Sequence, residues 1–446
     1  MKFLATTFLL VLCVLNTNAQ KTFSLKECIA YGLENHLSLK IAKNKEIAAD
    51  ASSKEALAGY LPKVNLNGSI DDNLKVQEQV IPAGVFGDED MRIAFTKQFN
   101  ITGTVELNQT IYDQSLIVGL KARKYYTMQS ELNTQQANEE LIYTITSSYY
   151  QVLVYKLQIQ FLKENLDTYK EQLRITELQV KKGVLAKVDL KKVQVDYNIT
   201  LSKIVTAENN LNNSLNILKN DIGFPLKDYL NIDDSDVNIL NEDYSQASSL
   251  IEFEPADRTG YLLDSINTDL LEIDYKRIKS QNLPKLSFYA RYGLTGFGNN
   301  LETSFNSTQS FSVIGIKLSA TIFEGFGKMA RANQAKIEYL NAVEQQKLNA
   351  SSFKVEVLNA SNNLKVAKAN IDAELENMAL AQSVFNTTKL QYNKGIATLR
   401  DWLDDQFAFK EAQNNYLSTV VDYYVATLDL QKARGSLETF YKTLKD

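Results

Sequence analysis

The sequence repeats one plan along its length, and this duplication constrains the fold more than any other feature. A Leu-Pro-Lys triplet around Pro62 returns around Pro284, at an offset of 284 − 62 = 222 residues. The segment that begins at Leu107 returns at Leu318, at an offset of 318 − 107 = 211. Self-similarity of this kind indicates two copies of one structural plan. The difference between the offsets, 222 − 211 = 11, places a loop of variable length between the two marks.

Between these marks apolar and polar residues alternate, which favours β-strands. Residues 93–111 carry apolar side chains at most odd positions and polar ones at most even positions. Lys97 breaks the alternation, and its long side chain is expected to reach a membrane rim. The charged residues Glu106, Arg291 and Lys317 fall in the polar phase of their runs. Such alternation is typical of membrane β-barrel strands, and three shorter runs share it: residues 64–70, 286–294 and 314–322.

Four alternating runs are too few for a barrel made by one chain, since about eight strands are the minimum. An open sheet edge in lipid leaves backbone groups unpaired at a cost of several kcal/mol each. The pattern therefore predicts a barrel shared between chains, and three chains would supply twelve strands. A soluble sheet with one solvated face is the alternative that alternation alone leaves open.

The segments that follow each strand pair have the pattern of long coiled-coil helices. Between residues 113 and 182 the only helix-breaking residue is Gly119, close to the start. At 1.5 Å per residue this segment would make a rod of about 105 Å. A return helix that includes Leu190 and Leu218 stops at residues 223–225. The apolar seams include Leu141, Ile145, Val152, Ile159, Leu166, Tyr169, Thr176 and Val180 in the first half, and Phe353, Val357, Ala360, Leu364, Ala367, Ile371 and Phe385 in the second.

Residues 1–19 are expected to be a secretory signal peptide, because a basic start precedes a short apolar run and a small-residue cleavage site. The run is too short to span a bilayer as a helix. After cleavage Cys28 is the only cysteine, so no intramolecular disulfide is expected. The net charge of −5, with both signs mixed, gives no basic stripe for nucleic acid.

An enzyme is disfavoured by the same composition. The single histidine, His36, belongs to no ligand cluster, and the paired acids at residues 71–72 and 233–234 fall in expected loops. No catalytic residue, cofactor or metal ion is therefore expected. An exported coiled-coil scaffold or adaptor without a barrel remains the alternative class, although the alternating strands would then have no role.

The expected organisation is mainly α with β, in two repeats. Each half reads helix, strand, loop, strand, long helix, tight turn and return helix. The expected boundaries are a signal peptide at 1–19, an N-terminal helix at 20–60, strands 1 and 2 at 61–112 with an extracellular loop at 73–92, a helical hairpin at 113–225, a crossover at 226–260 that forms a belt around the rods, a helix at 261–283, strands 3 and 4 at 284–323 with an extracellular loop at 299–309, and a second hairpin at 324–446.

The turns between the long helices resemble those of the TolC-like outer-membrane efflux family. The resemblance rests on residues 183–190 and 395–404, with residues 215–218 and 223–225 as a third mark. It implies a homotrimer in outer-membrane lipid, with a twelve-stranded barrel continued by a helical tunnel into the periplasm. It also implies a periplasmic membrane-fusion adaptor and an inner-membrane pump of RND or ABC type as partners. Drug efflux, metal efflux and protein secretion remain open, because the pump sets the cargo.

The two tip glycines, related by an offset of 395 − 183 = 212, are expected to end the long helices. Glycine is common just past a helix end because it accepts left-handed geometry. The resemblance adds a second role, docking of the adaptor, and extends it to neighbouring residues. The candidate docking set is Gly183, Val184, Leu185, Gly395 and Ile396.

A link across the tip is implied by Asp189 and Tyr392, which match positions that join neighbouring helices in relatives. The family's basic residue two positions after the second tip glycine is absent, since Ala397 stands there. The resemblance therefore does not identify the contact that holds the closed state.

Asp401 and Asp404 are expected to form a pore gate, because residues three apart share one helix face. In a three-fold assembly they would form rings of carboxylates, whose repulsion raises some of their pKa values and attracts cations. The alternative is that they are solvated acids near a helix start. Asp405 is a weaker candidate, and Trp402 is expected to serve packing.

Overall fold

The computed structural model describes residues 22–84, 87–233 and 253–444, so the expected signal peptide lies outside the described residues. Within these ranges the chain is mostly helical, with fewer residues in strands. A search of the described helices finds none that is both long and apolar enough to span a membrane. The chain divides into two compact units: the first holds Met1–Lys45, Glu131–Leu263 and Lys347–Asp446, and the second holds Glu46–Ser130 and Asp264–Gln346.

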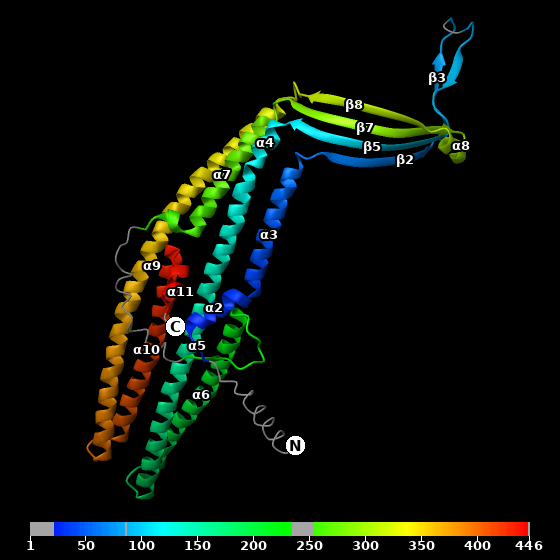
Figure 1. The fold of residues 1–446 in the computed structure, drawn as a ribbon. Helices are drawn as coiled ribbons and strands as arrows, with labels where there is room; N and C mark the ends of the chain where they lie inside the picture. Colours follow the sequence, from blue (N-terminus) through cyan, green and yellow to red (C-terminus); the bar gives the residue numbers. More distant parts are fainter. Residues whose placement is uncertain (1–21, 85–86, 234–252, 445–446) are drawn as a thin grey trace, which may run out of the picture. The chain divides into compact units, whose positions relative to one another are not determined.

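The second unit contains a four-stranded antiparallel sheet in the order β2, β5, β7, β8 (Figure 1). Glu106 on β5 lies directly opposite Arg291 on β7, and their side chains form an ion pair at 3.3 Å. These two residues share a face of the sheet, which agrees with the polar phase of the alternation. The strands are β2 Lys63–Asp72, β5 Phe99–Tyr112, β7 Lys285–Gly298 and β8 Gln309–Ser319.

The prediction of one strand over residues 93–111 is wrong. Strand β4, Met91–Ala94, instead pairs with β3, Glu78–Ile81, in a separate two-stranded hairpin (Figure 1). The backbone N–H of Asn73 donates to the carbonyl of Gln98 at 2.7 Å, and its side chain donates to the carbonyl of Lys97 at 3.1 Å. Lys97 therefore breaks the alternation because the chain bends there, between two strands.

The fourth strand also differs from the expected residues 314–322, since β8 begins at Gln309 and ends at Ser319. Ile322 lies beyond the strand and is 99% exposed. The loop before β8 contains a short helix, α8, Leu301–Asn306, whose start is closed by a reciprocal capping box between Asn300 and Thr303.

Two expected helices are each divided in two. The N-terminal helix breaks at His36 into α2, Leu25–Asn35, and α3, Leu37–Ala58. The long helix breaks at Lys121 into α4, Gln114–Leu120, and α5, Ala122–Lys181. Helix α7, Thr259–Ser280, lies mostly in the second unit, and α9, Gly327–Asn393, begins there.

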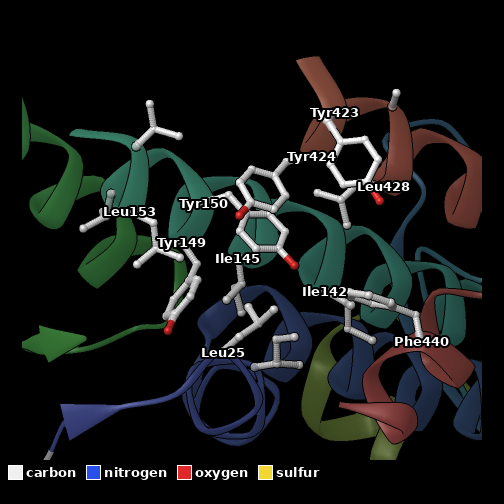
Figure 2. Close-up of a cluster of buried hydrophobic side chains, with 14 of the residues drawn as sticks. Leu25, Ile142, Ile145, Tyr149, Tyr150, Leu153, Tyr423, Tyr424, Leu428 and Phe440 are labelled. Atoms are coloured by element: carbon white, nitrogen blue, oxygen red, sulfur yellow. The ribbon is translucent and has the colours of Figure 1, made fainter. Parts of the chain in front are cut away.

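Two helical hairpins dominate the first unit. They are formed by α5 with α6, Lys187–Asp221, and by α9 with α10, Leu399–Arg434 (Figure 1). The apolar seams predicted from the spacing of four and three are largely buried, with Ile145 and Val152 fully so. Tyr150 and Tyr424 stack at 4.0 Å between ring centroids in this core (Figure 2). The last helix is α11, Leu437–Thr443.

The crossover is anchored at both of its described ends. Its start forms a short parallel pair between β1, Thr22–Phe23, and β6, Asn231–Ile232. At its end the guanidinium of Arg258 donates to both carboxylate oxygens of Glu356, at 2.6 and 3.2 Å, and lies over the ring of Phe353. The middle, residues 234–252, lies outside the described residues, so the belt remains a prediction.

Candidate functional site at the helix tips

The two tips of the hairpins have the same turn geometry. Gly183 and Gly395 adopt left-handed backbone with φ of +73° and +75°. In each turn the glycine N–H donates to the carbonyl three residues back, and the next residue donates to the carbonyl five residues back. This is the Schellman motif, which ends a helix and satisfies its last carbonyl groups. The glycines therefore act as helix caps.

The turns also expose apolar side chains. Val184 and Ile396, each directly after its glycine, are 68% and 73% exposed. A side-chain carbon added at either glycine would meet no atom within 4 Å, so the turns are open to solvent. Leu185 is half-buried and packs against the aromatic cluster above the tips. Of the five candidate docking residues, the structure thus presents Val184 and Ile396 most openly.

An aromatic layer joins the two hairpins above the tips. Trp402 is fully buried, and its ring lies 4.9 Å from that of Tyr392. Phe385 and Phe409 stack at 5.7 Å in the same cluster, which also contains Tyr169. The prediction that Trp402 serves packing is confirmed.

The expected partner of Tyr392 is different in the structure. Its hydroxyl donates to the side-chain carbonyl of Gln179 on α5, whereas the carboxylate of Asp189 pairs with Lys192 at 3.4 Å. Burial raises the pKa of the Tyr392 phenol, and the nearby charge of Asp189 adds to that rise. Asp189 is therefore a neighbour of Tyr392, and Gln179 is the residue that bonds to it.

The two candidate gate acids have different local partners. Asp401 accepts hydrogen bonds from the hydroxyl and backbone N–H of Thr398, at 2.7 and 2.8 Å, in a capping box that starts α10. These bonds hold the pKa of Asp401 below its ordinary value, opposite to the direction that a carboxylate ring would impose. The carboxylate of Asp404 is exposed and lies 3.6 Å from Arg400. Asp405 accepts from the hydroxyl of Thr388 on α9.

Buried polar residues along α5 and α10 were not anticipated. The amide of Asn165 donates to the side-chain oxygen of Gln413 at 2.7 Å. Seven residues further toward the tips on each helix (172 − 165 = 7 and 413 − 406 = 7) lie Gln172 and Gln406, 0% and 1% exposed. Neither side-chain amide has a hydrogen-bond partner in the structure. In the sequence, these buried polar residues could have been recognised by their spacing of seven residues beside the apolar seam.

The chain is similar in sequence and in fold to known outer-membrane proteins. The family model described as outer membrane efflux protein matches residues 31–223 and 269–436. The chain is 23% identical to Outer membrane protein TolC of Vibrio cholerae over 90% of this chain and 87% of that protein. It is 21% identical to the alkaline protease secretion protein AprF of Pseudomonas aeruginosa, over 75% and 69%. The fold is similar to that of the Campylobacter jejuni CmeC outer membrane channel, with a TM-score of 0.71 and 18% identity over 92% of this chain and 85% of that one.

Proposed function

The chain belongs to the outer membrane efflux protein family, and we propose that it is one protomer of a homotrimeric duct through the outer membrane. As a family member it is an outer-membrane efflux channel protein, with a helical part in the periplasm. In the proposed trimer, substrate passes without chemistry from an inner-membrane pump to the exterior.

The observation that carries the trimer is the sheet, which is too small to close. Strands β2 and β8 each have a neighbour in this sheet on one side only. Leu66 on β2 and Ile316 on β8 are 80% and 67% exposed, so both edge strands present apolar side chains. Three copies joined edge to edge would give a closed barrel of twelve strands, and closure removes unpaired edges from lipid.

The internal repeat supports a duct in which both halves of each chain contribute alike. The cap glycines of the two return helices, Gly223 and Gly435, are related by 435 − 223 = 212, the same offset as the tip glycines. All four adopt left-handed geometry. We propose the organisation expected from the sequence: residues 61–112 and 284–323 for the barrel, and residues 113–225 and 324–446 for the periplasmic hairpins.

We place adaptor docking at the tips, where two equivalent turns expose Val184 and Ile396. The gate is assigned to the second tip because acidic charge accumulates there. At the first tip the equivalents of Asp401 and Asp404 are Asp189 and Lys192 (401 − 212 and 404 − 212), which form an ion pair. The pump is of RND or ABC type in this proposal, and the name of the relative AprF makes secreted protein one possible cargo class.

Two measurements on the detergent-solubilised protein test the proposal. Native mass spectrometry is expected to give a trimer, and planar bilayers are expected to show pores. A folded monomer that forms pores alone contradicts the shared barrel. A protein that stays soluble without detergent and forms no pores is instead an exported scaffold.

The topology is tested by labelling intact cells with a membrane-impermeant maleimide. Because the mature chain is expected to retain only Cys28, which is buried, introduced cysteines can be read separately. Gly87→Cys and Glu302→Cys in the two strand-connecting loops are expected to react on intact cells. Val184→Cys is the matched control, which should react only after permeabilisation. The reverse pattern contradicts the topology.

A further inference from the structure

A hollow of about 430 Å³ opens on the second unit, between α3 and the junction of α4 with α5. Three cationic side chains line it, those of Lys121, Arg123 and Lys124, together with one carboxylate, that of Asp50. Asp50 already pairs with Lys54 at 2.7 Å. The hollow therefore faces solvent with an excess of positive charge.

Arg123 is held in place by a buried hydroxyl. Its Nε–H donates to Oγ of Ser53 at 2.8 Å, and Ser53 is 8% exposed. A guanidinium carries five N–H donors in a planar fork, which matches the oxygens of a phosphate group. The bond to Ser53 uses only the Nε–H, so the two terminal nitrogens can still donate to an anion. A fixed arginine beside Lys121 and Lys124, which are exposed, suits a phosphate.

An exposed aromatic pair follows strand β8 at a similar separation along the chain as the hollow follows strand β5. Tyr112 on β5 and Leu318 on β8 both lie opposite Leu286 on β7. Lys121 follows Tyr112 by 121 − 112 = 9 residues, and Phe326 follows Leu318 by 326 − 318 = 8. Phe323 and Phe326 are 71% and 70% exposed and pack edge to face. Phe326 has a φ of +63°, an unfavourable geometry for a bulky residue. Exposed aromatic rings gather where the bilayer meets water.

The two ends of the sheet differ in charge. The loops at the far end, residues 73–98 and 299–308, carry three basic and five acidic residues, for a net charge of 3 − 5 = −2. The lining of the hollow has three basic residues and one acidic residue, a net charge of 3 − 1 = +2. Basic pockets beside membrane-spanning elements are suited to anionic lipid head groups.

We propose that this hollow binds the phosphate of an anionic phospholipid in the leaflet that faces the periplasm. Arg123 holds the phosphate through its terminal nitrogens, and Lys121 and Lys124 supply the surrounding charge. The acyl chains extend toward the exposed aromatic pair. The inference rests on the membrane placement in the proposed function, and it adds a lipid site to the channel.

The test compares two triple variants of the full-length protein in detergent. Lys121→Gln/Arg123→Gln/Lys124→Gln removes the cations of the hollow. The matched control, Lys336→Gln/Lys354→Gln/Lys365→Gln, removes three exposed lysines of α9. Native mass spectrometry measures binding of dioleoylphosphatidylglycerol, with zwitterionic dioleoylphosphatidylcholine as the reference lipid. The first variant is expected to bind phosphatidylglycerol roughly tenfold more weakly or worse, and the control as the wild type.

A milder variant guards against misfolding. Ser53→Ala keeps every charge and removes only the hydroxyl that holds Arg123, so a smaller loss of phosphatidylglycerol binding is expected. Equal binding by the two triple variants overturns the proposal. Inorganic phosphate that displaces the lipid at similar concentration also overturns it, because the site would then be one for free phosphate. Pore formation is recorded separately: absent pores contradict the proposed function, whereas lost lipid binding with intact pores concerns only this site.

Discussion

Tyr392, near the end of α9, donates a hydrogen bond to the side-chain carbonyl of Gln179 on α5, and so ties the second tip to the first. Tyr392→Phe removes the donor and leaves a half-buried acceptor unsatisfied, at a cost of about 1 kcal/mol. We expect the tips to separate more readily, which single-channel recording would detect as a higher open probability. Asp189→Asn is the control, because Asp189 bonds to Lys192, and a larger effect from this control would restore the Asp189–Tyr392 link.

The gate assignment predicts that removing acidic charge at the second tip weakens cation selectivity. Asp404→Asn is the cleaner variant, because Asp401 also caps α10. Thr398→Ala is the matched control, since it removes the cap and keeps both carboxylates. Reversal potentials in a salt gradient should shift for Asp404→Asn and for the Asp401→Ala/Asp404→Ala double variant, and stay unchanged for Thr398→Ala. Unchanged selectivity in the double variant returns both residues to the role of solvated acids.

The same site predicts a pH dependence. Thr398 lowers the pKa of Asp401, so its capping contribution is present above the unfolded pKa and is lost as pH falls through the lower folded value. Asp401 should therefore stay ionised at pH 5, and its share of cation selectivity should persist below about pH 4. Selectivity that is already lost between pH 6 and 5 would mean that repulsion within a carboxylate ring outweighs the bonds from Thr398.

The docking assignment predicts that the exposed apolar residues matter more than the shape of the turn. Val184→Ser/Ile396→Ser leaves both glycine caps intact, so the trimer should form at wild-type level. Export in cells and co-purification of the adaptor should fall. Val80→Ser/Met91→Ser is the control, because it removes exposed apolar side chains from the β3–β4 hairpin instead. Equal loss of export in both variants would argue against a specific role for the tips.

Buried amides that lack partners predict a stabilising substitution. Gln172→Leu/Gln406→Leu replaces both with apolar groups of similar size, which is commonly neutral or stabilising. We expect a gain of about 1–3 kcal/mol in the free energy of unfolding. Asn165→Leu/Gln413→Leu is the comparison and should gain less, since that pair is hydrogen-bonded. Denaturant unfolding of the solubilised protein measures both, and a clear loss for the first variant would show that the amides have partners in the assembly.

The parts of the fold that were predictable are those that depend on local spacing. Ile145 and Val152 repeat at helical intervals because one face of α5 is buried, so the pattern reports directly on packing. Glu106 and Arg291 were placed in the polar phase for the same reason. The hairpin of β3 and β4 was missed because its bend depends on bonds from Asn73 to the far side of the loop, which no local pattern records.

The positions of the two tip turns could be predicted from the sequence, whereas the side-chain contacts between the hairpins could not. Gly183 and Gly395 are visible in the sequence because glycine is the usual residue in a left-handed helix cap. The Thr-x-x-Asp pattern from Thr398 to Asp401 is also the sequence pattern of a capping box, and the structure has that box at the start of α10. The bond between Tyr392 and Gln179 joins residues 213 apart in the chain, and such a pairing depends on how two hairpins pack.

The four left-handed glycines set a constraint on how such chains can change in evolution. Each return helix runs between caps separated by the same number of residues, 223 − 183 = 40 and 435 − 395 = 40. A single insertion in α6 would move its seam out of phase and leave one tip longer than the other. We therefore expect tunnel length to change by insertions of matched length in α5, α6, α9 and α10. Unmatched insertions and deletions should instead occur in residues 73–98 and 299–308, because these loops are not paired with a helix of matching length.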